Sequence, residues 1–130
     1  MKDFKSIYNS LKEKQTLYPK FWDKNMHLKK NVKNKLMNIS NHFEDYLEMD
    51  IVISDIVLMG SIAGYNWSEY SDVDIHLVVD FSQFPKNQID LYNELFKLKK
   101  SLYNKKYTIT IYGHEVELYI QNEDEMVYSS

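Results

Sequence analysis

The sequence predicts an α/β or α+β fold in which a short mixed β-sheet packs with helices. Three observations lead to this prediction. Two apolar segments have the length and β-branched content of strands, two longer segments repeat their apolar residues every three or four positions, and a Tyr-Gly pair separates two alternating segments near the C-terminal end. Helices followed by strands that are interleaved with a further helix favour this layered architecture.

The composition is that of one folded domain. The chain has 130 residues, of which 44% are hydrophobic and 15% aromatic, which favours an apolar core over disorder. We expect a single domain over 1–130, with a helical part at 1–50 and a sheet-bearing core at 51–121. The net charge of −3 gives no overall basic character, and the lack of cysteine excludes disulfides. No apolar stretch reaches the roughly 18 residues of a membrane span, so we expect a cytoplasmic protein without a membrane partner.

Three helices are expected from apolar residues at helical spacing. The first covers 3–14, the second runs from about 24 to 48, and the third covers about 86–102 after Pro85. In the second helix the apolar positions form one stripe that is expected to face the core: Leu28, Val32, Leu36, Ile39, Phe43, Tyr46 and Leu47.

Four strands are expected, at 51–59, at 72–80 and in a hairpin within 106–121 that turns at Tyr112-Gly113. Residues 60–70 are expected to form a turn that contains a helical turn. Because side chains alternate along a strand, each of these strands should have two distinct faces. In the second strand Val73, Ile75, Leu77 and Val79 are expected on one face and Asp72, Asp74, His76 and Val78 on the other. In the second arm of the hairpin Val116, Leu118 and Ile120 are expected on one face and Glu115, Glu117 and Tyr119 on the other.

Two carboxylates on one face of a strand suggest a metal site. Asp72 and Asp74 are two residues apart, so their side chains leave the same face roughly 6–7 Å apart at the backbone. Like charges this close repel each other unless a cation lies between them. Mg²⁺ suits this arrangement because it prefers oxygen ligands and commonly binds one or two carboxylates together with phosphate oxygens. Two such ions can clamp both oxygens of a phosphoryl displacement, and a third carboxylate on a neighbouring strand would complete the site.

The Gly60-Ser61 pair before these aspartates has the character of an anion-binding turn. Glycine allows a sharp turn and a close approach of the backbone to a ligand. Successive N–H groups in such a turn can bind an anion, and the Ser61 hydroxyl adds a further donor. The sequence therefore combines a turn that could hold phosphates with a strand that could hold metal ions.

Together these features resemble the nucleotidyltransferase superfamily, whose members have a polymerase-beta-like fold. Gly60-Ser61 is followed after nine residues by Ser71-Asp72-Val73-Asp74 at the start of a strand, and Val116-Glu117-Leu118 resembles the later strand that carries the family's third acid. The family usually has Asp at that position, so Glu117 departs from the pattern, and Glu115 is the alternative. The resemblance covers about 51–121.

The resemblance implies a role for each matching residue. Gly60 and Ser61 would hold the β- and γ-phosphates of a nucleotide, and Ser71 would orient the loop that enters the second strand. Asp72 and Asp74 would bind both metal ions. Glu117 would bind the catalytic ion and assist deprotonation of the acceptor hydroxyl, so that Asp72, Asp74 and Glu117 are the expected catalytic residues and metal ligands.

The implied reaction is transfer of a nucleoside monophosphate from an NTP, with ATP as the expected substrate, to an acceptor hydroxyl with release of pyrophosphate. The expected cofactors are two Mg²⁺ ions, with Mn²⁺ as an alternative, and the acceptor is an RNA or a partner protein. Two other readings stay open. One is a pyrophosphokinase of the alarmone-synthetase type, and the other is a non-catalytic nucleotide-binding or antitoxin-type interaction module of the same fold.

Several other residues have two interpretations. Tyr65 and Trp67 could stack on a nucleobase or could pack their loop on the core. His114 follows the hairpin turn and is expected to be exposed. The lysine-rich segments HLKKNVKNK and KLKKSLYNKK are either solvated helix faces or a surface that attracts phosphates.

Overall fold

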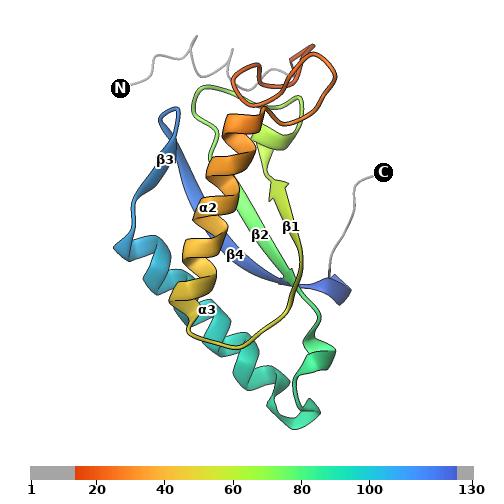
Figure 1. Cartoon of the computed structure of the whole chain (residues 1–130), viewed down its shortest axis with the longest axis vertical. Coiled ribbons are helices and arrows are strands. Elements are labelled where there is room, and N and C mark those ends of the chain that lie inside the picture. Colours follow the sequence, from red (N-terminus) through yellow and green to blue (C-terminus); the bar gives the residue numbers. More distant parts are fainter. Residues whose placement is uncertain (1–13, 126–130) are drawn as a thin grey trace.

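A four-stranded mixed sheet forms the centre of the computed structural model, which describes residues 14–125 (Figure 1). The strand order is β1-β2-β4-β3. β1 (Ile53–Met59) is antiparallel to β2 (Val73–Val79), and β2 is parallel to β4 (His114–Asn122). β3 (Ile109–Ile111) forms the short antiparallel hairpin with β4. The expected mixed sheet is therefore confirmed, and β2 and β4 are its two interior strands.

Two long helices accompany the sheet. α2 (Lys30–Leu47) crosses one face of the sheet, and α3 (Ile89–Lys106) connects β2 to the β3–β4 hairpin (Figure 1). Short 3₁₀ turns lie at 61–63, 81–83, 86–88 and 123–125. Among the described residues, no helix has both the length and the apolar character needed to cross a membrane.

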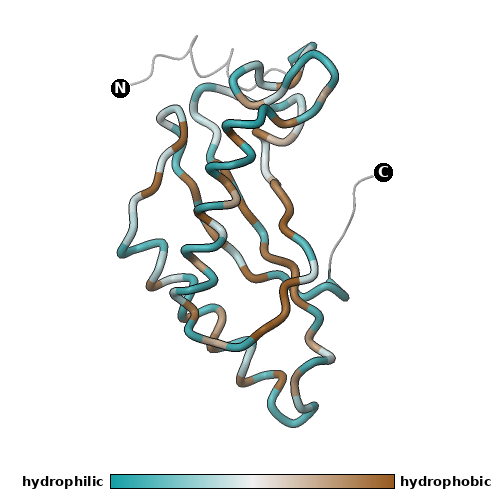
Figure 2. The backbone as a smooth tube through the Cα atoms, viewed as in Figure 1, coloured by the Kyte–Doolittle hydropathy of each residue, from teal (hydrophilic) through white to brown (hydrophobic). Residues whose placement is uncertain are grey.

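The hydrophobic core lies between α2, α3 and one face of the sheet. Apolar residues are concentrated along the strands (Figure 2). The two faces of β2 and β4 differ as alternation requires at most positions, since Asp72, Asp74 and Glu117 keep solvent contact on the face opposite the helices. Two positions differ: Val78, on the face of the acids, is buried, and Ile120 is only partly buried. The buried set includes Val32, Leu36, Phe43 and Leu47 of α2, Val73, Ile75, Leu77 and Val79 of β2, and Val116 and Leu118 of β4.

α3 also covers the free edge of β4 beyond the short β3. The Asn104 side chain donates to the Leu118 carbonyl and accepts from the Leu118 N–H, both at 3.1 Å. One amide thus replaces the strand partner that β3 does not provide there, and no backbone group of Leu118 is left without a hydrogen bond. This contact fixes α3 beside the strand that carries Glu117.

The helix boundaries differ from the prediction at α2. The expected start at about 24 is wrong, because 23–27 forms a turn in which the Asp23 carboxylate accepts from the N–H groups of Asn25 and His27. Met26 has φ 63°, which no right-handed helix allows. Asp commonly forms such side-chain turns, so a competing local interaction delays the start of the helix to Lys30. The expected helix at 3–14 lies outside the described residues except for residue 14.

α3 was expected at about 86–102 and instead spans Ile89–Lys106, after a 3₁₀ turn at 86–88. The Tyr112-Gly113 turn is confirmed: both residues have positive φ, 50° and 81°, as the tight hairpin requires. The 61–63 helical turn is confirmed as well.

Candidate active site

The parallel pairing of β2 with β4 brings two acidic residues from distant parts of the chain side by side. Asp74 is the direct register partner of Glu117. Neighbouring strands lie about 4.7–4.9 Å apart, and register partners point to the same face, which here is the face without helices. Glu115, the alternative third acid, is instead the register partner of Thr110 on β3 and is exposed. The arrangement therefore favours Glu117 as the neighbour of Asp74.

Asp74 experiences the charges of the other two acids. Its pKa is raised, first by burial of the carboxyl group, then by the nearby Glu117 and Asp72 carboxylates, while His76 acts in the opposite direction. Burial and like charges both disfavour the ionised form. The three acids thus form one electrostatic group, and a cation beside Asp74 would relieve its repulsion.

Glu117 has a specific hydrogen-bond partner on its own strand. The Tyr119 hydroxyl donates to Glu117 Oε2 at 2.6 Å, and this bond, together with burial, raises the Tyr119 pKa and keeps the phenol protonated. The Tyr119 ring stacks on His76 with centroids 4.7 Å apart, and Lys100 Nζ lies 4.2 Å from the ring centroid. Tyr119 therefore holds Glu117 from a fixed position. The sequence placed Tyr119 on the correct face, but only the structure reveals its contact with Glu117.

The Gly60 backbone lies directly against the Asp74 carboxylate. Gly60 has φ 84° and ψ −175°, a conformation that is essentially restricted to glycine. A Cβ built on Gly60 would lie 2.8 Å from Asp74 Oδ2. The register pairs the preceding residue, Met59, with Asp74, so the end of β1 delivers the turn to the acids.

Ser61 and Ser71 join the turn to the start of β2. Their hydroxyl oxygens are 2.7 Å apart, and the Ser71 hydroxyl also accepts from the Ser68 N–H at 2.8 Å. Ser71 is buried, whereas Ser61 is exposed at the start of the 61–63 turn. The structure therefore ties Ser71 to the loop, in keeping with its expected orienting role, and leaves Ser61 as the accessible hydroxyl.

His114 is buried, so the expectation that it is exposed is wrong. Only 3% of its surface is accessible, and both ring nitrogens are hydrogen-bonded. Nδ1 lies 2.6 Å from the Ser71 carbonyl, which can only accept, and Nε2 lies 2.8 Å from the Tyr18 hydroxyl. Neutral His114 therefore donates through Nδ1 and accepts through Nε2. This connects the segment before α2 to the residue that precedes Asp72.

Replacing His114 by alanine is expected to destabilise the fold. The substitution leaves the Ser71 carbonyl and the Tyr18 hydroxyl without their partner, at about 1–3 kcal/mol for each buried group. Urea denaturation of His114→Ala should show the loss, while His27→Ala, at an exposed position, should match the parent protein. Equal midpoints for both variants would show that these bonds contribute little.

The loop between the two motif halves is partly packed. Trp67 donates its indole N–H to the Thr16 carbonyl at 2.6 Å, and its ring lies 4.9 Å from that of Tyr18. These contacts favour the loop-packing interpretation for Trp67. Tyr65 keeps 40% of its surface accessible, and its hydroxyl lies 3.8 Å from Met26 Sδ.

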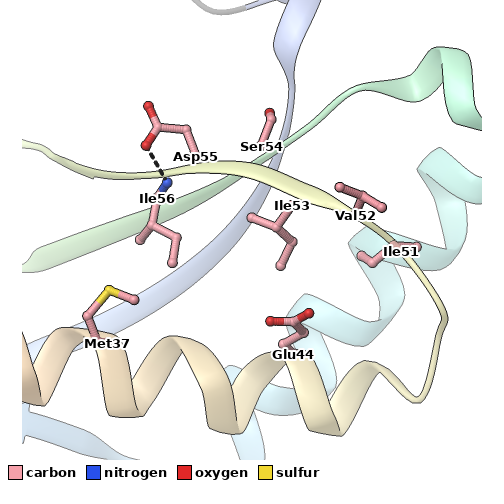
Figure 3. A pocket seen from close by; sticks show the side chains of 8 residues that line it. All are labelled: Met37, Glu44, Ile51, Val52, Ile53, Ser54, Asp55 and Ile56. Carbon is pink, nitrogen blue, oxygen red and sulfur yellow. Dashed lines mark hydrogen bonds between the residues drawn. The ribbon is translucent and has the colours of Figure 1, made fainter.

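A cavity of about 500 Å³ lies away from the acids, between α2 and the first half of β1 (Figure 3). Met37 and Glu44 of α2 face Ile53 and Ile56 of β1 across it, and Asp55 accepts a hydrogen bond from the Ile56 N–H (Figure 3). This is the opposite end of β1 from Met59, so the cavity is not part of the acidic site.

The acidic site is suited to Mg²⁺ by its ligand chemistry. Among residues 14–125, no three acidic or histidine side chains are gathered closely enough to form a ready-made metal site. Mg²⁺ does not require one, since it usually binds through one or two carboxylates plus substrate phosphates and water. Asp74 and Glu117 on adjacent strands, with Asp72 near Asp74, could supply such carboxylates, and the Gly60 backbone lies against Asp74.

Comparison with known proteins does not assign the site. Models of protein families, curated proteins and solved structures were all searched, and none matches this chain. A proposal of function therefore depends on the arrangement of the residues themselves, above all on the pairing of Asp74 with Glu117 next to the Gly60 turn.

Proposed function

We propose that this protein is a metal-dependent nucleotidyltransferase with a polymerase-beta-like fold. The observation that carries the proposal is the register of β2 with β4, which sets Asp74 beside Glu117 directly under the Gly60 backbone. The Gly60 turn and the Asp74 carboxylate are thus in direct contact, which supports a joint role for the turn and the acids. A mixed sheet with helices on one face is compatible with the same proposal.

Each residue has a defined task in the proposed reaction. Asp72, Asp74 and Glu117 bind two Mg²⁺ ions, with Mn²⁺ as an alternative, and these ions would neutralise negative charge on the phosphate oxygens. The Gly60 turn and the Ser61 hydroxyl hold the β- and γ-phosphates of an NTP. Glu117 also accepts the proton of the acceptor hydroxyl as that oxygen attacks the α-phosphorus and pyrophosphate leaves. Positioning and charge neutralisation supply most of the catalysis.

Product analysis tests the proposal. The purified protein is incubated with α-³²P- or γ-³²P-labelled ATP, MgCl₂ and total RNA or protein extract, and the label is followed. A nucleotidyltransferase transfers the α-label to the acceptor and releases labelled pyrophosphate from the γ-label. Release of AMP with transfer of the γ-label would instead identify a pyrophosphokinase. Metal-dependent thermal stabilisation by ATP without any transfer, across all acceptors tried, would favour a non-catalytic nucleotide-binding module.

Tyr119 is expected to act as a positioning residue for Glu117. In Tyr119→Phe the ring remains stacked on His76, but the hydroxyl that donates to Glu117 Oε2 is lost. Loss of an outer hydrogen-bond partner of a metal ligand typically costs about 10–100-fold in metal affinity or activity. We therefore expect kcat to fall by about 10-fold or more and the Mg²⁺ concentration for half-maximal activity to rise, with the KM for ATP little changed.

A tyrosine distant from the acids provides the control. Tyr107→Phe removes a hydroxyl from a residue that packs on His42 and Tyr46 on the helix side of the sheet. It should leave the Mg²⁺ dependence unaltered. An unchanged Mg²⁺ dependence in Tyr119→Phe would contradict the positioning role, even if that variant were less stable.

A further inference from the structure

The charges of α2 are arranged against its own helix dipole. Lys30 and Lys33 occupy the first turn, which has no acidic residue, and the last turn has no basic residue. A helix dipole favours the reverse arrangement, by about 0.3–1 kcal/mol for each well-placed charge. The helix dipole therefore does not explain the lysines of this segment, and one of them, Lys35, lies over the exposed ring of Tyr112.

One flank of the molecule combines lysines with tyrosines. We call it the lysine–tyrosine track, and its members lie on the loop before α2, on α2, at the end of α3 and just after it, and at the β3–β4 turn. They are Lys20, Lys35, Tyr46, Lys99, Lys106, Tyr107 and Tyr112. In Figure 1 the C-terminal end of α3 lies on the same side of α2 as the β3–β4 hairpin.

Tyr112 forms one end of the track. Lys20 Nζ and Lys35 Nζ lie 5.9 and 5.5 Å from its ring centroid, and Asn31 donates to its hydroxyl at 2.9 Å. The residue keeps 45% of its surface accessible and has φ 50°, a strained value for an aromatic residue in a turn that favours Asn or Gly. An exposed ring is thus held close to two cations and to the Phe21 ring, at a conformational cost.

Tyr46 and Tyr107 form the other end. Lys99 Nζ and Lys106 Nζ lie 5.6 and 6.0 Å from the Tyr46 ring, and Lys106 Nζ is also 5.4 Å from the Tyr107 ring. Lys35 and Tyr46 are separated by eleven residues of α2, or about 16 Å at 1.5 Å per residue. The track therefore has the length of several nucleotides of a single strand.

The track lysines are not neutralised by carboxylates. Within residues 14–125 the structure shows a single ion pair, between Lys97 and Glu94, and neither residue belongs to the track. Because the whole chain has a net charge of −3, positive charge is confined to part of its surface. An anionic partner would therefore be directed to that part and away from the rest of the molecule.

We propose that the lysine–tyrosine track binds single-stranded nucleic acid. Lysines supply contacts to phosphates, and the exposed Tyr112 ring supplies a face on which a base stacks, which is worth about 1–3 kcal/mol, while Tyr46 and Tyr107 are partly buried and hold Lys99 and Lys106 at the surface. The alternation of the two residue types favours a nucleic acid over a polyanion without bases. Lys99, within the track, is followed by Lys100, which lies over Tyr119 beside Glu117. The track thus continues around α3 toward the acidic site, but binding does not depend on catalysis there.

Fluorescence anisotropy with a labelled single-stranded RNA of about twelve nucleotides tests the track directly. At 50 mM salt we expect binding in the micromolar range, with affinity that falls steeply as salt rises. Lys35→Glu/Lys106→Glu should weaken binding at least about tenfold and reduce the salt slope. The matched control, Lys33→Glu/Lys105→Glu, makes the same charge change on the same two helices away from the track tyrosines and should stay within about twofold of the parent.

The contribution of stacking is tested at Tyr112. Tyr112→Phe keeps the ring and should bind nearly as the parent does, while Tyr112→Asn suits the positive φ of the turn but removes the ring and should bind several-fold more weakly. The Asp72→Asn/Asp74→Asn variant should bind RNA normally, which separates this proposal from the proposed catalysis. Absence of RNA binding, equal losses in the two lysine pairs, or equal affinity for heparin with no effect of Tyr112→Asn would each overturn it.

Discussion

Replacing Asp72 and Asp74 together by asparagine is expected to abolish nucleotide transfer while leaving the fold intact. The amide has the size of the carboxylate but lacks its charge, so the proposed Mg²⁺ ligands are lost without a packing defect. Removing a single electrostatic contact to a transition state commonly costs about 10²–10³-fold in kcat, so loss of two carboxylates should exceed about 10³-fold. The measurement is the rate of pyrophosphate release from ATP in MgCl₂.

The single variant Asp74→Asn should show how the charge of Asp74 affects the stability of the fold. The Asp74 pKa is raised in the folded protein, by burial first and then by Glu117 and Asp72. The folded state therefore binds the proton more tightly than the unfolded state, and stability falls as pH rises through the range just above the ordinary Asp pKa. Asparagine has no proton to release, so Asp74→Asn should flatten this part of the stability–pH profile and make the metal-free protein more stable at pH 7.

Asp80→Asn provides the matched control at the other end of β2. The Asp80 carboxylate accepts from the Ser82 N–H at 2.9 Å, and asparagine can make the same capping bond. This variant should keep its activity and its Mg²⁺-dependent thermal stabilisation by ATP. Transfer that persists in Asp72→Asn/Asp74→Asn, or a metal-free Asp74→Asn that is less stable than the parent at pH 7, would contradict the assigned site.

Local patterns in the sequence correctly predicted most of the strands and the turn of the hairpin. The period-two alternation of Val73, Ile75, Leu77 and Val79 identified the buried face of β2, since that signal depends only on neighbouring residues. The Tyr112-Gly113 turn was predicted for the same reason. The start of α2 was missed because the Asp23 side chain competes for backbone N–H groups, an interaction that the apolar periodicity does not register.

Contacts between distant segments could not be predicted. The sequence placed Asp74 and Glu117 on open faces of two strands, but their parallel register depends on how α3 returns the chain to the sheet. His114 is buried by Tyr18, which is 96 residues away in sequence, so its position after a turn gave a misleading indication of exposure. The resemblance therefore implied that the acids share one site, whereas the register that pairs Asp74 with Glu117 and the Tyr119 contact required the fold.

Replacing Gly60 by alanine is expected to damage both the fold and the site. The backbone conformation of Gly60, φ 84° and ψ −175°, is one that costs other residues about 1–3 kcal/mol. In addition, the new methyl group would lie 2.8 Å from Asp74 Oδ2, closer than such contacts allow, so the Asp74 carboxylate must move. We expect a lower melting temperature by several degrees and a loss of transfer activity that exceeds the loss of folded protein.

Substitutions at two other glycines distinguish the effect of backbone strain from that of the clash with Asp74. Gly113 has φ 81° with open space around a built Cβ, so Gly113→Ala introduces strain without a clash, and Gly64 has neither strain nor a close neighbour. Gly64→Ala should be nearly neutral, and Gly113→Ala should lower stability without affecting the Mg²⁺ requirement. If the contact with Asp74 matters, Gly60→Ala must be worse than Gly113→Ala, and in an Asp74→Ala background its cost should shrink toward that of Gly113→Ala. The loss of stability and activity caused by Gly60→Ala could instead be the same with and without the Asp74 side chain. The turn and the acid would then be neighbours that do not depend on each other, which is incompatible with a single phosphate- and metal-binding site.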